Sequence, residues 1–234
     1  MIRTVAETGS TNDDLAVLAR EGAPEGSWLR AERQTSGRGR QGRAWASPPG
    51  NLYASTLVRL RPGDPAPPTL ALVAAVAVQE VASAFAPDAE LRLKWPNDLF
   101  AGGRKLAGIL LERQGEAVVI GFGVNLAHHP EAMDHPAASF ASLTRAAPDP
   151  AVFAEALADG FARWLGRWRN EGLAPVRTRW LAVAHPSGTA LSTHGPGEQR
   201  IEGLFEGLDE TGALRLRLPD GTLWVHQAGD VFLI

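Results

Sequence analysis

The chain has 234 residues, of which 44% are hydrophobic, and its formal net charge is −3. These values exclude wholesale disorder and allow one main domain followed by a small one. The absence of cysteine excludes disulfides, thiolate metal sites and a cysteine nucleophile. The N-terminus has no signal-peptide core, and the longest apolar run, 70–78, is too short to span a bilayer. We therefore expect a cytoplasmic protein with no membrane partner.

Helices and strands are predicted throughout the N-terminal half. Ser10 to Asp13 is typical of a helix start with Ser10 as the N-cap, and capping alone explains these residues. The N-terminus of a helix also suits an anionic or polar ligand. A strand is predicted over 28–32, and alternating residues predict a second over 52–60. The alanine- and valine-rich segment 69–85 has no wide polar face and predicts a buried helix.

The central segments predict three more strands, over 91–95, 105–112 and 117–124, and Pro96-Asn97-Asp98 ends the first of them. Glycines alternate near the end of the third strand, at 121 and 123. Such a pattern allows a close approach to the backbone, either by a ligand or by a packed neighbour.

The segment 128–150 reads as a loop, and it carries His128, His129 and His135. No carboxylate stands at a convincing ligand spacing, so a metal cluster there is disfavoured. Helices are predicted over 152–168 and 175–184. Beyond Gly188, closely spaced short strands separated by turn residues predict a small β-barrel of about fifty residues.

Glycine and arginine dominate the run 36–43, which reads Ser-Gly-Arg-Gly-Arg-Gln-Gly-Arg and is followed by Ala44-Trp45. Glycines let the backbone approach a ligand closely, and guanidinium groups match phosphate or carboxylate. Trp45 suits stacking on a flat ring. The alternative is a solvated basic loop or an RGG-like nucleic-acid segment, but such segments lie in low-complexity sequence. Because the loop over 36–45 is rich in glycine and lacks apolar anchors, we expect it to be mobile without ligand and to order as a lid over the bound ligand.

Arginine supplies nearly all of the positive charge, because the 23 basic residues comprise 21 arginines and two lysines, Lys94 and Lys105. An ammonium is a compact charge that a planar guanidinium does not reproduce. A retained lysine is therefore either a remnant or a group with a chemical role. Lys105 is the better candidate for such a role.

Five motifs in this order and spacing resemble the biotin protein ligases. They are Ser10-Thr11-Asn12, Gly37 to Arg43 with Trp45, Lys94-Trp95-Pro96-Asn97-Asp98, Arg104 to Leu110, and Gly121 to Asn125, with Gln34 between the first two. The resemblance implies an α+β fold, with a mixed-sheet catalytic domain over 1–186 and an SH3-like barrel over 187–234. No helix-turn-helix precedes the motifs, so the chain resembles the ligase-only type and no DNA partner is expected.

The resemblance implies a two-step reaction. Biotin and ATP first form biotinyl-5′-AMP, and the biotinyl group then passes to a lysine of the biotin carboxyl carrier protein of an acyl-CoA carboxylase. Mg²⁺ is expected on the ATP phosphates, with Asp98 as a candidate ligand. The barrel would position ATP or the carrier rather than biotin. A homodimer is compatible with the resemblance, although the sequence does not determine the oligomeric state.

Matching the motifs residue by residue also implies the site. Lys105 and Arg40 would act as catalytic residues at the junction of carboxylate and phosphate. Trp45 would stack on adenine, and Asn125 would bind its edge. The implied biotin-binding residues are Ser10, Thr11, Asn12, Gln34, Gly37, Arg38, Arg40, Lys105, Gly108 and Leu110. The implied nucleotide-binding residues are Arg38, Arg40, Arg43, Trp45, Asn97 and Asn125.

Two other functions remain open at this point. A lipoate ligase would share the catalytic fold, whereas transferases that use a cysteine thioester are excluded by composition. A non-catalytic nucleic-acid-binding module would need basic clusters beyond the scattered arginines of this chain. Exchange of pyrophosphate into ATP that depends on biotin, on lipoate or on neither separates the three.

Overall fold

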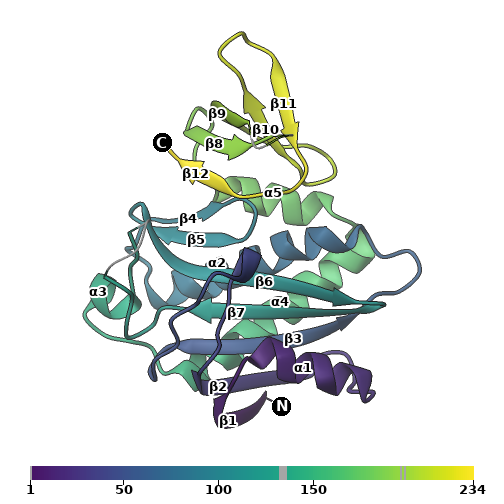
Figure 1. Cartoon of the computed structure of the whole chain (residues 1–234), viewed down its shortest axis with the longest axis vertical. Coiled ribbons are helices and arrows are strands. Elements are labelled where there is room, and N and C mark those ends of the chain that lie inside the picture. Colours follow the sequence, from purple (N-terminus) through teal and green to yellow (C-terminus); the bar gives the residue numbers. More distant parts are fainter. Residues whose placement is uncertain (1, 132–135, 196, 198) are drawn as a thin grey trace.

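The computed structural model describes residues 2–131, 136–195, 197 and 199–234. Two sheets organise the molecule, one of seven strands and one of five. The larger sheet and its helices form the lower body in Figure 1, and the smaller sheet stands above it with the C-terminus. The fold class is therefore confirmed: α+β, with a mixed sheet followed by a small β unit.

The large sheet has the strand order β1-β2-β3-β7-β6-β5-β4. The β1–β2 pair is parallel and every other neighbouring pair is antiparallel. The sequence patterns predict neither β1 nor β5, and Asp98 begins β5 rather than only ending the preceding strand. The strands are β1 Ile2–Thr8, β2 Trp28–Gln34, β3 Leu52–Arg59, β4 Leu91–Lys94, β5 Asp98–Ala101, β6 Arg104–Gln114 and β7 Ala117–Val124.

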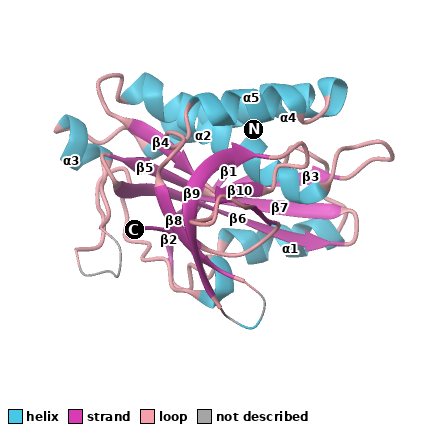
Figure 2. Ribbon diagram, turned by 90° about the horizontal axis from the view of Figure 1, so that it is seen from above, coloured by secondary structure: helices cyan, strands magenta, loops and turns pink. Residues whose placement is uncertain are grey.

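Helices cover both faces of this sheet. In Figure 2, α2, α4 and α5 lie along one face and α1 lies on the other. The short α3 interrupts a segment that the sequence predicts as a loop. The helices are α1 Thr11–Arg20, α2 Leu70–Phe85, α3 Phe140–Thr144, α4 Pro150–Glu171 and α5 Ala174–Ala182.

The helix α2 is the centre of the main core, as its composition predicts. It packs against β4, β5 and β6 on one side and against α4 and α5 on the other. Within the described residues, Pro67–Phe85 is the one helical stretch long and apolar enough to cross a membrane. Because 67% of it is buried inside the protein, burial in this core accounts for its apolar character.

The helix α1 positions its N-terminus over the opposite face of the sheet. Leu15, Ala16 and Ala19 pack against Leu29, Leu57, Ala117 and Val119 in a second, smaller core. Ser10 caps the helix, since its hydroxyl accepts a hydrogen bond from the Asp13 amide. The predicted cap is confirmed. Because α1 packs in this second core, the residues that follow Ser10 are held in a fixed position.

The small sheet has the order β11-β10-β9-β8-β12, and all its pairs are antiparallel. Side chains of the large body donate hydrogen bonds to backbone carbonyls of this C-terminal unit. Trp95 Nε1 donates to the Gly212 carbonyl at 3.0 Å, and Arg177 donates to the Leu208 carbonyl. The strands are β8 Ala190–His194, β9 Arg200–Leu208, β10 Leu214–Arg217, β11 Leu223–His226 and β12 Val231–Leu233.

Candidate active site

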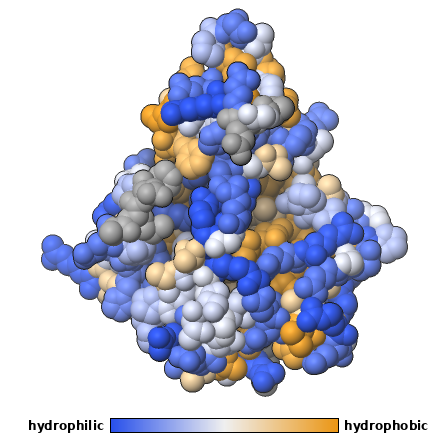
Figure 3. Space-filling model, in the orientation of Figure 1, coloured by the Kyte–Doolittle hydropathy of each residue, from blue (hydrophilic) through white to orange (hydrophobic). Residues whose placement is uncertain are grey.

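One cavity of about 870 Å³ is lined by every residue that the motifs assign to biotin, nucleotide or metal. The glycine–arginine loop, residues 36–45, crosses in front of the large sheet in Figure 1. On the same face, Figure 3 shows hydrophilic residues gathered below the small sheet. The predicted residues brought together here are Ser10, Thr11, Asn12, Gln34, Gly37, Arg38, Arg40, Arg43, Trp45, Asn97, Asp98, Lys105, Gly108, Leu110 and Asn125.

Uncharged polar groups form a connected network at the α1 end of the cavity. Gln34 Oε1 accepts from the Thr11 amide at 2.9 Å and from its hydroxyl at 3.1 Å. The Thr11 hydroxyl also bonds Ser55, which donates to Asn12 Oδ1 at 2.6 Å. Gln34 Nε2 donates a hydrogen bond to Ser47 Oγ. The side chains are therefore held in place by one another before any ligand arrives.

Arg38 fastens the first part of the glycine–arginine loop to α1 and β6. Its guanidinium makes a two-point contact with the Asp13 carboxylate and lies 3.1 Å from Glu112 Oε1. The hydrogen bond from Arg38 lowers the pKa of Asp13, against the opposing effect of burial. Arg38 therefore lines the cavity, and its positive charge is paired with the carboxylates of Asp13 and Glu112.

Trp45 anchors the other end of this loop on a platform of two glycines. Gly108 on β6 and Gly123 on β7 are register partners. A Cβ at Gly123 would lie 2.6 Å from Trp45 Cε2, and one at Gly108 would lie 3.1 Å from Cζ3. The indole therefore lies directly on the sheet, so the expectation of a loop without an apolar anchor was wrong.

The alternating glycines of β7 are explained by packed side chains. Gly123 accommodates Trp45, and a Cβ at Gly121 would lie 2.3 Å from Asn12 Oδ1. Gly37 is needed for the same reason, because its Cβ would lie 2.5 Å from Ser47 Oγ and 2.7 Å from the Trp45 carbonyl oxygen. Close approach rather than a left-handed backbone explains glycine at these positions.

Both lysines of the chain contact one carboxylate at the floor of the cavity. Lys105 Nζ lies 2.7 Å from Asp98 Oδ1, and Lys94 Nζ lies 3.4 Å from Oδ2. Burial alone would raise the pKa of Asp98, but the charges of Lys105 and Lys94 lower it overall. Lys105 also lies 5.5 Å from the centre of the Trp45 ring. The candidate catalytic lysine is thus held between a carboxylate and an aromatic face.

The two predicted asparagines are bonded to the main chain. Asn97 donates to the Ile109 carbonyl, and Asn125, which is 3% exposed, donates to the Ala138 carbonyl at 3.1 Å. Asn125 Nδ2 also lies 3.5 Å from the Lys105 carbonyl oxygen. Asn125 therefore supports the backbone that carries Lys105, with its amide nitrogen already engaged.

The described residues do not offer a carboxylate cluster for a metal. They contain no group of three or more histidine, cysteine, aspartate or glutamate side chains that could hold an ion. Asp98 is engaged by two ammonium groups instead. In the histidine segment, His129 Nδ1 lies 3.0 Å from Ser139 Oγ, and His135 lies outside the described residues.

The motif-based assignment does not include Asp230 or the following β12 residues, 231–233, which also line the cavity. Arg43 Nη2 lies 2.8 Å from Asp230 Oδ2, and Arg40 lies 3.5 Å from Oδ1. Arg40 also donates to the Gly229 carbonyl at 2.9 Å. No local sequence pattern marks Asp230, because only the packing of the two sheets brings it to the loop.

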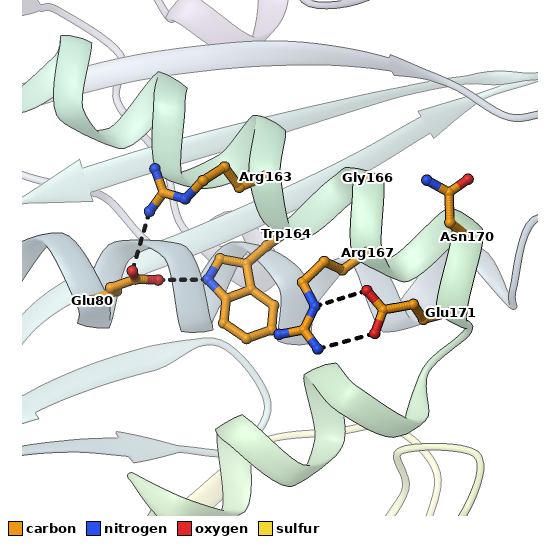
Figure 4. Close-up of a pocket in the computed structure, with 7 residues that line it drawn as sticks. All are labelled: Glu80, Arg163, Trp164, Gly166, Arg167, Asn170 and Glu171. Atoms are coloured by element: carbon orange, nitrogen blue, oxygen red, sulfur yellow. Dashed lines mark hydrogen bonds and ion pairs between the residues drawn. The ribbon is translucent and has the colours of Figure 1, made fainter.

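A second, shallower hollow lies on the helical face, between α2 and α4 (Figure 4). Glu80 on α2 accepts from Arg163 and from Trp164 Nε1, and Arg167 makes a two-point contact with Glu171. The charged groups of this hollow are therefore matched among themselves. It carries none of the predicted site residues.

Comparison with known families identifies both parts of the chain. Residues 8–125 match the Biotin/lipoate A/B protein ligase family, and residues 195–234 match the Biotin protein ligase C terminal domain. A biotin--[acetyl-CoA-carboxylase] ligase of Paracoccus denitrificans is 40% identical over 239 aligned positions, covering 97% of this chain and 98% of that protein.

Solved structures show the same architecture. The biotin protein ligase of Aquifex aeolicus in complex with biotin and ATP superposes with a TM-score of 0.89 over 100% of this chain and 99% of its own, at 24% identity. That likeness concerns the fold. The biotin protein ligase of Leishmania major in complex with biotinyl-5-AMP has a TM-score of 0.68 at 26% identity, covering 97% and 98% of the two chains.

Proposed function

The chain belongs to the biotin/lipoate A/B protein ligase family, and we propose that its cavity carries out both half-reactions of a biotin--[acetyl-CoA-carboxylase] ligase. In the first, the biotin carboxylate attacks the α-phosphorus of ATP, the α–β phosphoanhydride bond breaks, and pyrophosphate leaves. In the second, a carrier lysine amine attacks the acyl carbon of biotinyl-5′-AMP, AMP leaves, and the amine loses a proton. The observation that carries this proposal is the convergence of all the motifs on one cavity.

The α1 end of the cavity suits the uncharged ring system of biotin. Thr11, Gln34 and Asn12 present hydroxyl and amide groups that both donate and accept, as a cyclic urea requires. Ser10, at the N-terminus of α1, lines the same end. Leu110 on β6 supplies apolar surface for the thioether ring and chain. Gly108, which lies under the Trp45 indole and the Lys105 side chain, lines the same part of the cavity and leaves room for those two side chains.

The cationic end suits the junction of carboxylate and phosphate. Two anionic groups must meet there, so preorganised positive charge lowers the barrier. We assign Lys105 and Arg40 to this junction and Arg43 to the phosphates. Arg40 and Arg43 contact Asp230, an internal carboxylate that occupies these guanidinium groups until phosphate competes for them.

Trp45, Asn97 and Asn125 line the part assigned to the nucleotide. The indole rests with one face on the sheet, and adenine would stack on its other face. The donor set does not fit a resident magnesium ion, because Asp98 is engaged by Lys94 and Lys105. We therefore propose that Mg²⁺ arrives with ATP and neutralises phosphate charge there.

We assign residues 1–186 to catalysis and 187–234 to a C-terminal unit that closes one side of the cavity, in a cytoplasmic enzyme. The acceptor is the biotin carrier of a carboxylase. To test the function, enzyme, biotin, ATP, Mg²⁺ and a carrier domain are incubated, and the carrier should gain the mass of a single biotin. Lipoate in place of biotin should give no adduct. An unmodified carrier in the presence of folded enzyme and biotin would contradict the assignment.

A further inference from the structure

Lys94 is a partly buried cation to which the proposed reaction gives no part. Its side chain is 11% exposed, against 26% for Lys105. Arginine fills 21 of the 23 basic positions of the chain, yet both lysines contact the same carboxylate. The two positions at which arginine is not used therefore meet at Asp98, whose side chain is 12% exposed.

Three contacts hold the Lys94 ammonium in place. It donates to the Val231 carbonyl at 2.6 Å, lies 3.4 Å from Asp98 Oδ2, and lies 5.4 Å from the centre of the Phe100 ring. The register of β4 and β5 sets Lys94 opposite Asp98. Lys105 takes the other oxygen, Oδ1. The carboxylate is thus shared between two ammonium groups, one on each oxygen.

The sharing changes the charge that a ligand meets. An Asp98–Lys105 pair alone would be neutral, whereas the three groups together carry one net positive charge. Arg40 and Arg43 form ion pairs with Asp230 beside this cluster, and the negative charge of Asp230 also favours the charged form of Lys94. Burial lowers the pKa of Lys94, and the charge of Asp98 opposes that effect. In a partly desolvated site, one unit of charge affects anion binding more strongly than in water.

We propose that Lys94 is a positioning residue that acts through Asp98. By holding one carboxylate oxygen it prevents Asp98 from neutralising Lys105, so that the Lys105 ammonium keeps net charge for an anionic carboxylate and α-phosphate. Asp98 in turn fixes where that ammonium lies. This inference rests on the proposed function, because it takes the Lys105 ligand to be the reacting biotin and ATP.

Two variants of Lys94 and one matched control test the proposal in biotin-dependent pyrophosphate exchange. Lys94→Met removes the charge, and Lys94→Gln removes it while keeping a donor for the Val231 carbonyl. Both should raise the KM for ATP on the order of tenfold. Arg92→Met removes the same charge two residues earlier on β4, where Arg92 contacts the exposed Glu90. It should change KM less than about twofold.

A double variant separates charge from a merely structural role. Adding Asp98→Asn to Lys94→Met restores one net positive charge, so the KM for ATP should return most of the way to the wild-type value, while kcat stays low. If Lys94 has only a structural role, the KM for ATP of the double variant should instead be higher than that of either single variant. Melting temperatures check folding, and Lys94→Gln carries the test if Lys94→Met does not fold.

The outcomes distinguish this inference from the function on which it rests. Wild-type protein without biotin-dependent exchange refutes the function. If the wild-type protein is active but Lys94→Met and Lys94→Gln change the KM for ATP no more than Arg92→Met does, the inference is overturned. A double variant whose KM is as high as that of Lys94→Met also overturns it.

Discussion

Arg43 Nη2 lies 2.8 Å from Asp230 Oδ2, and this ion pair fastens the glycine–arginine loop to the small sheet. Asp230 is 187 positions further along the chain (230 − 43), and its side chain is only 14% exposed. Together with the contact between Arg38 and Asp13 and the packing of Trp45 on Gly123, the pair holds the loop at three points. The loop is therefore an anchored element whose cations already face a carboxylate.

Asp230→Asn should loosen the loop in the absence of ligand. A partly buried ion pair contributes on the order of 1 kcal/mol, so hydrogen exchange at residues 39–43 should accelerate about fivefold. Asp220→Asn is the control, since it removes the same charge from an exposed turn of the same sheet, where Asp220 bonds Thr222. Equal exchange in the two variants would show that the pair does not hold the loop.

Ligands should slow exchange across residues 36–45. Biotin and ATP offer a carboxylate and phosphates for which Arg40 and Arg43 can leave Asp230, and the glycine-rich backbone then closes over them. The comparison is hydrogen exchange of the wild-type protein with and without both ligands. Unchanged protection across the loop is the result that argues against a lid.

The main elements of the fold could be predicted from local pattern. The cap at Ser10, the apolar helix around Val76 and the strand over 117–124 are all recognisable in sequence, because burial and capping leave strong local signals. β1 carries no alternating pattern, because its half-buried residues are spaced by three and it is held by pairing with β2. β5 gives no clear strand signal in sequence, because it has four residues and starts immediately after turn-forming residues.

The residues of the site fall into two groups, those that can be found from sequence and those that cannot. The motif residues could be found because each motif is local, and the cavity brings them together. The role of Asp230 and the Lys94–Asp98 contact could not be found from sequence, because each depends on tertiary packing. Asp230 reaches the loop only because the small sheet packs there, and Lys94 meets Asp98 through the β4–β5 register. Sequence also left open whether Gly123 faces a ligand or a neighbour, and the structure places Trp45 there.

Gly123→Ala should displace the Trp45 indole and weaken nucleotide binding. Its Cβ would lie 2.6–2.8 Å from three atoms of a rigid ring, so the ring must move. Because a displacement of about 1 Å in an active site can cost up to a hundredfold, kcat/KM for ATP should fall at least tenfold. Gly108→Ala is the comparison, since its contact with the indole is 3.1 Å, and it should be milder. In a Trp45→Ala background, Gly123→Ala should have little further effect; a full additional loss would refute the explanation.

Glu25→Gln should destabilise the protein without touching the cavity. Both Glu25 oxygens lie 2.7 Å from the guanidinium of Arg169, whose side chain is 11% exposed. Leaving that guanidinium short of a partner should cost roughly 2 kcal/mol of unfolding free energy. Glu171→Gln, on the same helix as Arg169 but in an exposed pair, should leave the melting temperature unchanged.

The same pair predicts an acid-dependent loss of stability. The hydrogen bond from Arg169 lowers the pKa of Glu25 from 4.5 to about 2. A carboxylate with a depressed folded-state pKa contributes fully above its unfolded value, and the contribution is lost as pH falls from about 4.5 towards 2. Melting curves across this window should show wild type and Glu25→Gln converging at low pH. A constant difference would contradict this origin of the stability.

Lys105→Arg should abolish most activity in both half-reactions while the fold is retained. The lysine runs over Gly108, where a Cβ would lie 3.4 Å from both its Cε and its Nζ, and it ends 2.7 Å from Asp98 Oδ1. A guanidinium is broader and planar, so it cannot occupy this channel and keep its charge at the same point. A misplacement of about 1 Å should cost on the order of a hundredfold in rate. The measurements are biotin-dependent pyrophosphate exchange and carrier labelling, with an unchanged melting temperature as the control. Near-normal rates in both assays would remove Lys105 from the catalytic residues.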